Sequence, residues 1–162
     1  MINRIHLEMI KLYCGDPKRI QHFCKVHSYA KLIAEMENVD AKTLFILETA
    51  ALTHDIGIHL CEEKYGNCNG KLQEKEGPAI AEKLLAELGF SREVSERVQY
   101  LITHHHTYNN IDGIDYQILV EADFLVNLFE DKVSPDGCRN AYHKIFRTES
   151  GKRLYRAMYP TA

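Results

Sequence analysis

The segment 50-AALTHDIG-57 places a histidine and a carboxylate side by side at the end of an apolar stretch. Apolar residues recur along 41–56 at close to the helical period, in a stripe too wide for a helix with one solvated face. We therefore expect a core helix. A carboxylate is rarely buried unless it is paired or binds a cation, so Asp55 is anomalous there. Either His54 and Asp55 reach one cation together, or Asp55 is solvated and His54 packs as a neutral side chain.

Length and composition fit one globular domain. The chain has 162 residues, of which 45% are hydrophobic and 27% charged, enough to bury a single core. Its net charge of -3 provides no basic surface for duplex nucleic acid. We find neither a signal peptide nor a run of 18 apolar residues, so no membrane partner is expected. The five cysteines are an odd number without a Cys-x-x-Cys pair, which indicates reduced thiols in a cytoplasmic protein.

The helix that precedes this segment carries a candidate ligand. Asp16 can cap it and Pro17 suits its first turn, and we expect it to run to about Asn38. His27 lies about 140° around the helix from His22, so the two cannot easily serve one ion. His22 points toward the core because it shares a face with three apolar residues, namely Val26, Ala30 and Ile33.

Further helices follow the His-Asp segment. Residues 57–72 are rich in glycine and polar turn formers, so we expect Gly57 to end the first helix and a long loop to cover the site. A helix from about Pro78 to Leu88 comes next. Another, capped by Ser91, ends in the triple histidine 104–106. No segment alternates as paired strands do, and the sequence therefore predicts an all-α fold.

A second buried carboxylate is predicted near the end of the chain. Asp115 can cap a helix that is apolar on nearly every side, which indicates a central position. Asp123 lies in its middle, and no Lys or Arg occurs between Asp115 and Glu130 to pair with it. A cation or a tertiary partner is therefore implied. The amphipathic helices that follow, at 134–158, are typical of packing elements.

Four residues on three predicted core helices thus point inward. Two imidazoles and two carboxylates suit a divalent transition metal ion such as Mn, Fe, Co, Ni or Zn, with positions left open for water or substrate. The candidate ligands are His22, His54, Asp55 and Asp123.

This ordered set of His, His-Asp and Asp on successive helices resembles the HD-domain superfamily of metal-dependent phosphohydrolases. The resemblance runs from Arg19 to Asp131 and includes 19-RIQHFCKV-26, 54-HDIG-57 and 121-EAD-123. It implies a helical bundle in which the four candidate ligands hold a metal.

The same resemblance implies a single HD-like domain over residues 1–162. The motif-bearing core would span about 16–132, and the helices at 134–158 would complete the domain. The apolar residues of these C-terminal helices can serve a homodimer as readily as the core.

Many two-metal members of the superfamily carry further histidines at two places. The later place is filled here by His105 and His106, but Gln73 stands at the earlier one. A neutral amide is a poor ligand for a transition metal, so we expect one ion rather than two. His105 and His106 would then bind substrate phosphate or transfer protons near neutral pH, unless they form a solvated helix end.

The resemblance implies a phosphohydrolase that cleaves a phosphate ester of a small molecule, such as a nucleotide, by metal-activated water. One alternative is a sensor module that binds metal and nucleotide or phosphate without turnover. Another is an HD-type iron oxygenase, which would need two irons and is disfavoured by Gln73. The identities of the substrate and the native metal do not follow from the sequence.

Overall fold

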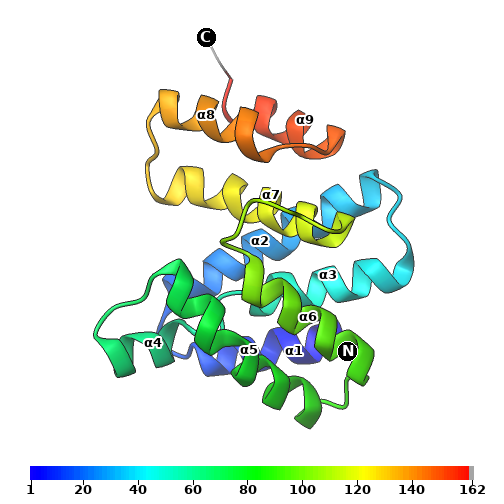
Figure 1. Cartoon of the computed structure of the whole chain (residues 1–162), viewed down its shortest axis with the longest axis vertical. Coiled ribbons are helices and arrows are strands. Elements are labelled where there is room, and N and C mark those ends of the chain that lie inside the picture. The colour runs from blue at the N-terminus through cyan, green and yellow to red at the C-terminus, as the bar shows by residue number, and fades with distance from the viewer. Residues whose placement is uncertain (161–162) are drawn as a thin grey trace.

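A computed structural model describes residues 1–160 of the chain and confirms the all-α prediction over that range. Its helices stack in layers, with the last two lying on one side of α7 and the remainder on the other (Figure 1). The elements are α1 (Ile2–Leu12), α2 (Pro17–Met36), α3 (Ala41–Thr53), α4 (Ile58–Tyr65), α5 (Gly70–Glu87), α6 (Arg92–His104), α7 (Ile114–Glu130), α8 (Pro135–Ile145) and α9 (Glu149–Met158).

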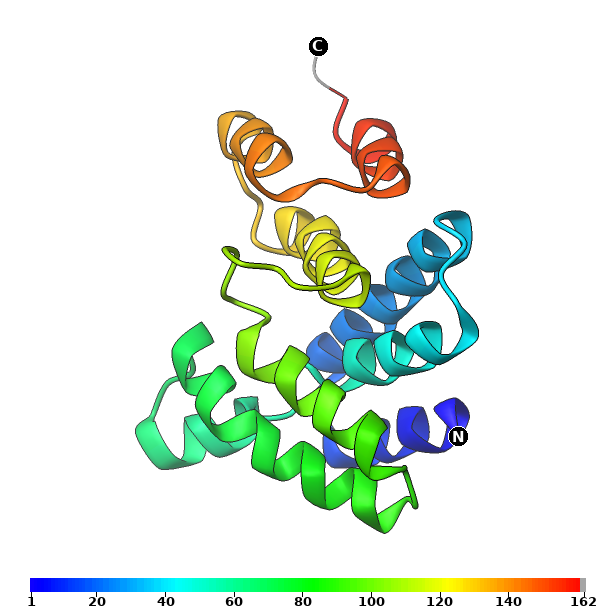
Figure 2. The same ribbon diagram turned by 45° about the vertical axis from the view of Figure 1, so that its right-hand side comes forward.

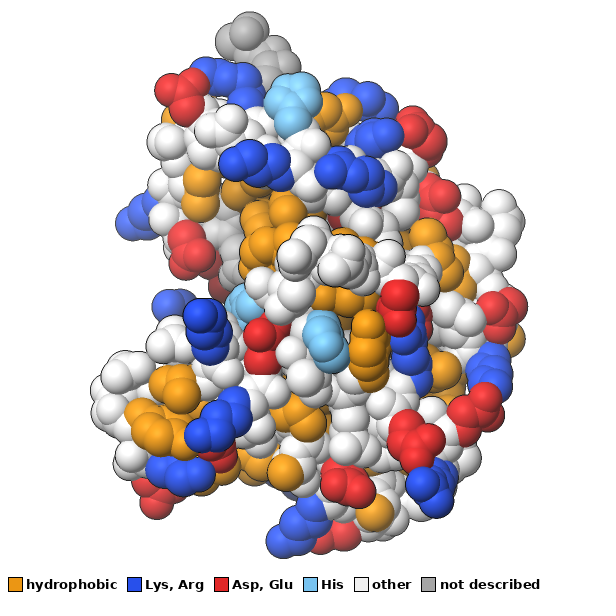
Figure 3. Space-filling model, viewed as in Figure 1, with side chains coloured by type: hydrophobic (Ala, Val, Ile, Leu, Met, Phe, Trp, Pro, Cys, Tyr) orange, Lys and Arg blue, Asp and Glu red, His pale blue; other side chains and the backbone are white. Residues whose placement is uncertain are grey.

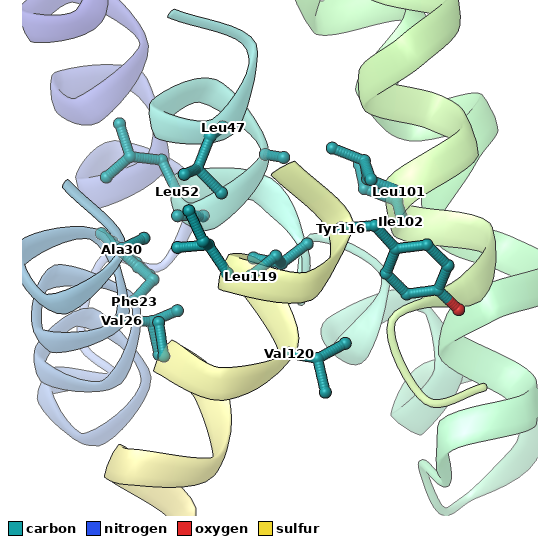
Figure 4. Close-up of a cluster of buried hydrophobic side chains, with 14 of the residues drawn as sticks. Phe23, Val26, Ala30, Leu47, Leu52, Leu101, Ile102, Tyr116, Leu119 and Val120 are labelled. Atoms are coloured by element: carbon teal, nitrogen blue, oxygen red, sulfur yellow. The ribbon is translucent and has the colours of Figure 1, made fainter. Parts of the chain in front are cut away.

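The core lies where α2, α3, α6 and α7 meet (Figure 4). Helix α3 is buried without interruption from Ile46 to Thr53, and α7 is buried over most of its length, as its apolar sequence predicts. The segment Ala41–Tyr65 is long and apolar enough to cross a membrane by length and composition alone. However, 72% of its most apolar window is buried inside the bundle, as expected for a core helix.

Two helix starts agree with the predicted caps. The Asp16 side chain accepts a hydrogen bond from the Arg19 amide, and the Ser91 side chain caps α6 in the same way. Asp40 caps α3. The predicted cap of α7 was wrong. Gly113 precedes that helix, while the Asp115 carboxylate receives hydrogen bonds from the Arg97 guanidinium at 2.7 and 2.8 Å.

Two predicted helix ends also differ from the structure. Helix α2 ends at Met36, short of Asn38, because Asn38 adopts a left-handed conformation with φ of 56°. Helix α3 ends at Thr53, so His54 and Asp55 lie in a turn. Gly57 does not close the helix by a left-handed conformation, since its φ is -80°.

The predicted loop over residues 57–72 was wrong. Helix α4 fills half of it, and α5 begins at Gly70 rather than at Pro78, which lies inside that helix. Ile58 and Cys61 are buried, so α4 is held by tertiary packing, and Asn69 caps α5. The two helices form a corner that projects from the lower part of the molecule (Figure 2).

Candidate metal centre

The structure brings the four predicted ligands together. His22 lies on α2, His54 and Asp55 lie in the turn after α3, and Asp123 lies on α7. The two Nε2 atoms of His22 and His54 are 3.3 Å apart, and Oδ1 of Asp123 lies 3.2 and 3.6 Å from them. Oδ2 of Asp55 is 3.5 Å from each Nε2 atom. His54 and Asp123 are only 1% and 3% exposed, so this is an interior cluster.

The Nδ1 atoms of His22 and His54, which point away from the cluster, both form hydrogen bonds. Nδ1 of His54 donates to the Ala51 carbonyl at 3.0 Å, and Nδ1 of His22 donates to Glu130 Oε2 at 2.9 Å. Because both partners are acceptors, each neutral imidazole directs the Nε2 lone pair into the cluster. Glu130 is itself paired with Lys25, whose Nζ lies 2.5 Å from Oε1.

Asp123 provides the clearest sign that the cluster suits a cation. Its buried Oδ1 atom makes no hydrogen bond to any described residue, although a buried carboxylate oxygen ordinarily has a partner. Two imidazole nitrogens and two carboxylates converge there without a donor between them. This donor set fits a borderline divalent metal ion, and His22, His54 and Asp123 lie close enough together to hold one.

Without an ion, protons must neutralise the cluster. Burial lowers the pKa of His22, but the nearby carboxylates of Asp123 and Asp55 outweigh it and raise the pKa to about 9. Burial acts in the opposite direction on the carboxylates. There the neighbouring histidines prevail and hold the pKa values of Asp55 and Asp123 well below their usual range. The cluster therefore has the electrostatics of a cation site.

A second cluster adjoins the first through Asp55. Oδ1 of Asp55 lies 3.6 Å from Nε2 of His105, and Oε1 of Gln73 lies 3.3 Å from the same nitrogen. Gln73 Oε1 also accepts a hydrogen bond from Nε2 of His106 at 2.7 Å. His105 is 1% exposed, so the alternative of a solvated helix end is wrong for this residue. Burial, and secondarily the charge of His105, lowers the pKa of His106 to about 4.

The other histidines examined in the sequence lie apart from the two clusters. His27 pairs with Glu48 at 2.9 Å, in agreement with the prediction that it cannot share an ion with His22. Nδ1 of His104 donates to the Tyr100 carbonyl at 2.7 Å.

Sequence reasoning missed two supporting residues. Glu130 holds His22, and it lies two turns after Asp123 on the same face of α7, a spacing that could have revealed it. The Tyr13 hydroxyl donates to the Asp55 carbonyl at 2.7 Å and fixes the turn. That contact joins residues far apart in the sequence, and no local pattern predicts it.

The molecular surface is hollowed beside the projecting α4–α5 corner (Figure 3). Histidine and acidic side chains are visible next to this hollow. The partly exposed Asp55 provides the contact between solvent and the otherwise buried first cluster.

Comparisons with known proteins agree with this geometry. The chain is similar to the crystal structure of a predicted HD superfamily hydrolase from an uncultured Thermotogales bacterium, with 28% sequence identity and a TM-score of 0.68. The similarity covers 98% of this chain and 83% of that one. A search of curated proteins gave no significant match. The family model for the HD domain matches residues 19–136, which contain both clusters, and the chain therefore belongs to the HD-domain family.

Proposed function

We propose that this protein is a metal-dependent phosphohydrolase that cleaves a phosphate ester of a small molecule, such as a nucleotide. The observation that carries the proposal is the buried Asp123 Oδ1 atom, which faces the Nε2 atoms of His22 and His54 without a hydrogen bond. Membership of the HD-domain family supports a hydrolytic function at the level of reaction class.

The ion would be held by His22, His54, Asp55 and Asp123. When bound, a divalent ion lowers the pKa of a water molecule and neutralises charge on phosphoryl oxygens. We propose one tightly bound ion rather than two. Gln73 supports this proposal because its amide, a poor ligand for a transition metal, lies against the second cluster, with Oε1 2.7 Å from Nε2 of His106.

His105 is suited to donate a proton to the leaving oxygen. Its Nδ1 donates to the Ile102 carbonyl at 2.7 Å, so Nε2 carries a proton only in the imidazolium form. Nε2 faces two acceptors, Oε1 of Gln73 and Oδ1 of Asp55. A histidine buried beside the candidate ligands is placed to act as the general acid of phosphate-ester cleavage.

Phosphate release from a panel of nucleotides and simple phosphate esters tests the proposal. The metal-free protein would be reloaded with Mn, Co, Ni or Mg before each assay. We expect release with at least one metal and none after chelation. Binding of metal and nucleotide without product would contradict the proposal and support a sensor module.

A matched pair of histidine variants tests whether His105 is the general acid. We expect His105→Ala to lower kcat by about 100-fold while the protein keeps its metal, since general acid catalysis contributes on that order. His104→Ala removes the neighbouring histidine, whose Nδ1 bonds to a backbone carbonyl, and should leave kcat within about twofold. Equal rates in the two variants would remove His105 from the mechanism.

A further inference from the structure

The C-terminal hairpin of α8 and α9 differs in charge from the remainder of the chain. Residues 135–160 contain six Lys and Arg against two Asp and Glu, whereas the whole chain has 20 against 23. Basic side chains gather over this part of the surface (Figure 3). Glu121 anchors the hairpin to α7 by accepting hydrogen bonds from the amides of Arg147 and Thr148. A basic surface on an acidic protein indicates affinity for anions.

A groove runs along the outer side of this hairpin. Its central cavity of about 330 Å³ is lined by Arg139, Tyr142, Tyr155, Arg156 and Tyr159, among others. Cavities of about 350 and 400 Å³ each share several lining residues with it. Volumes of this size suit a small organic ligand.

The walls of the groove are aromatic. The ring of Tyr155 lies 4.7 Å from that of Tyr142 and 5.3 Å from that of Tyr159, centroid to centroid. Tyr155 is 2% exposed, and its buried hydroxyl has no hydrogen-bond partner among residues 1–160. An unpartnered buried hydroxyl is unfavourable, and a ligand whose polar group entered between the tyrosine rings would satisfy it.

Two arginines of the hairpin have no carboxylate partner within residues 1–160. Arg156 donates to the Tyr142 hydroxyl at 3.1 Å. The Arg147 guanidinium donates to the backbone carbonyls of His143, Lys144 and Phe146. Arg156 is exposed and lines the cavity, so its charge is available to an anion, and a guanidinium binds phosphate in bidentate geometry.

We propose that this groove binds a nucleoside phosphate at a site separate from the metal centre. The aromatic ring of the ligand stacks on the tyrosines, its phosphate pairs with Arg156, and a polar group bonds the Tyr155 hydroxyl. The volume of the central cavity, about 330 Å³, suits a mononucleotide, whereas a long nucleic acid would meet the acidic remainder of the chain.

Calorimetric titration with AMP in the presence of EDTA tests the site. Chelation removes metal-dependent binding and turnover, so the result is independent of the proposed phosphohydrolase function. We expect one AMP bound per chain. Adenosine lacks the phosphate and inorganic phosphate lacks the aromatic ring, so each should bind at least about tenfold more weakly than AMP.

Three variants locate the binding. Arg156→Gln should weaken AMP binding by about tenfold or more, since it removes the phosphate partner. Tyr155→Phe keeps the ring and should weaken binding by about threefold through loss of the hydroxyl. Arg92→Gln makes the same charge change on α6, where the side chain is 91% exposed, and should leave the affinity unchanged. Circular dichroism checks that each variant is folded.

Three outcomes would overturn the proposal. One is the absence of AMP binding at millimolar concentration. Another is AMP binding that is unaffected in folded Arg156→Gln and Tyr155→Phe. The third is a groove covered by another macromolecule, shown by a dimer that dissociates in Arg156→Gln or by a single-stranded oligonucleotide that binds more tightly than AMP.

Discussion

Helix α7 carries two buried carboxylates, Glu121 and Asp123, whose surroundings are opposite. Glu121 is 0% exposed and accepts hydrogen bonds from the Gln117 amide, the Arg147 and Thr148 backbone amides and the Thr148 hydroxyl. Asp123 is 3% exposed, and its Oδ1 accepts none from the described residues. Two residues of helix place the side chains about 200° apart, so one faces the hairpin and the other the histidines.

This difference in hydrogen-bond partners distinguishes a structural role for a buried carboxylate from a ligand role. Hydrogen bonds from the chain itself satisfy Glu121, which fixes the hairpin in place. Asp123 lies against imidazole nitrogens that, when neutral, offer lone pairs rather than protons. Burial alone therefore does not identify a ligand, whereas burial without a donor does.

Asp123→Ala gives the largest expected effect on the metal. We expect the affinity for a divalent ion to fall by about 100-fold or more, since loss of a ligand exceeds the effect of losing its supporting residue. The free energy of unfolding of the metal-free protein should change less than in Glu121→Ala, because Oδ1 of Asp123 accepts no hydrogen bond from the described residues. Isothermal titration with Mn and urea denaturation measure the two quantities. Asp131→Ala, an exposed substitution at the end of α7, is the control.

Glu121→Ala should show the reverse pattern. We expect the free energy of unfolding to fall by about 3 kcal/mol, because the backbone amides and the hydroxyl that bond Glu121 lose their acceptor. Metal affinity should stay within about twofold of the wild type. Glu149→Ala, at an exposed position on the neighbouring helix, controls for the loss of charge. If Glu121→Ala lost much of its metal affinity and little of its stability, Glu121 would behave as we expect of Asp123, and the proposed difference between the two carboxylates would be wrong.

Glu130→Gln should have a smaller effect on the metal than loss of a ligand. Glu130 orients His22 through Nδ1, and loss of such a supporting carboxylate lowers metal affinity by about 10-fold to 100-fold. The amide keeps an acceptor oxygen, so Glu130→Gln should bind metal more tightly than Glu130→Ala. Titration with Mn compares the two, and equal affinities in both variants and the wild type would show that Glu130 does not position His22.

The candidate ligands could be predicted from the sequence because each belongs to a pattern within one short segment. The helical face of His22 and the apolar surroundings of Asp123 each follow from a spacing along a single helix. The roles of Glu121 and Tyr13 depend on contacts with distant segments. No local spacing indicates such contacts.

The missed start of α5 has a specific cause. Glycine and proline weaken the interior of a helix, so the sequence places Gly70 in a loop and Pro78 at the start of the next helix. In the structure, a Cβ on Gly57 would lie 2.9 Å from the Gly77 amide nitrogen, and one on Gly70 would lie 2.7 Å from the His106 ring. These glycines allow close contact between segments, and the packing compensates for their low helix propensity.

Metal content after loading tests the central claim most directly. The purified wild type and Asp55→Ala would be loaded with Mn, passed through a desalting column and analysed by mass spectrometry for ions per chain. We predict one ion per chain in the wild type and almost none in folded Asp55→Ala, since that carboxylate lies 3.5 Å from both ligand nitrogens. Full metal content in Asp55→Ala would contradict the assignment of the metal centre.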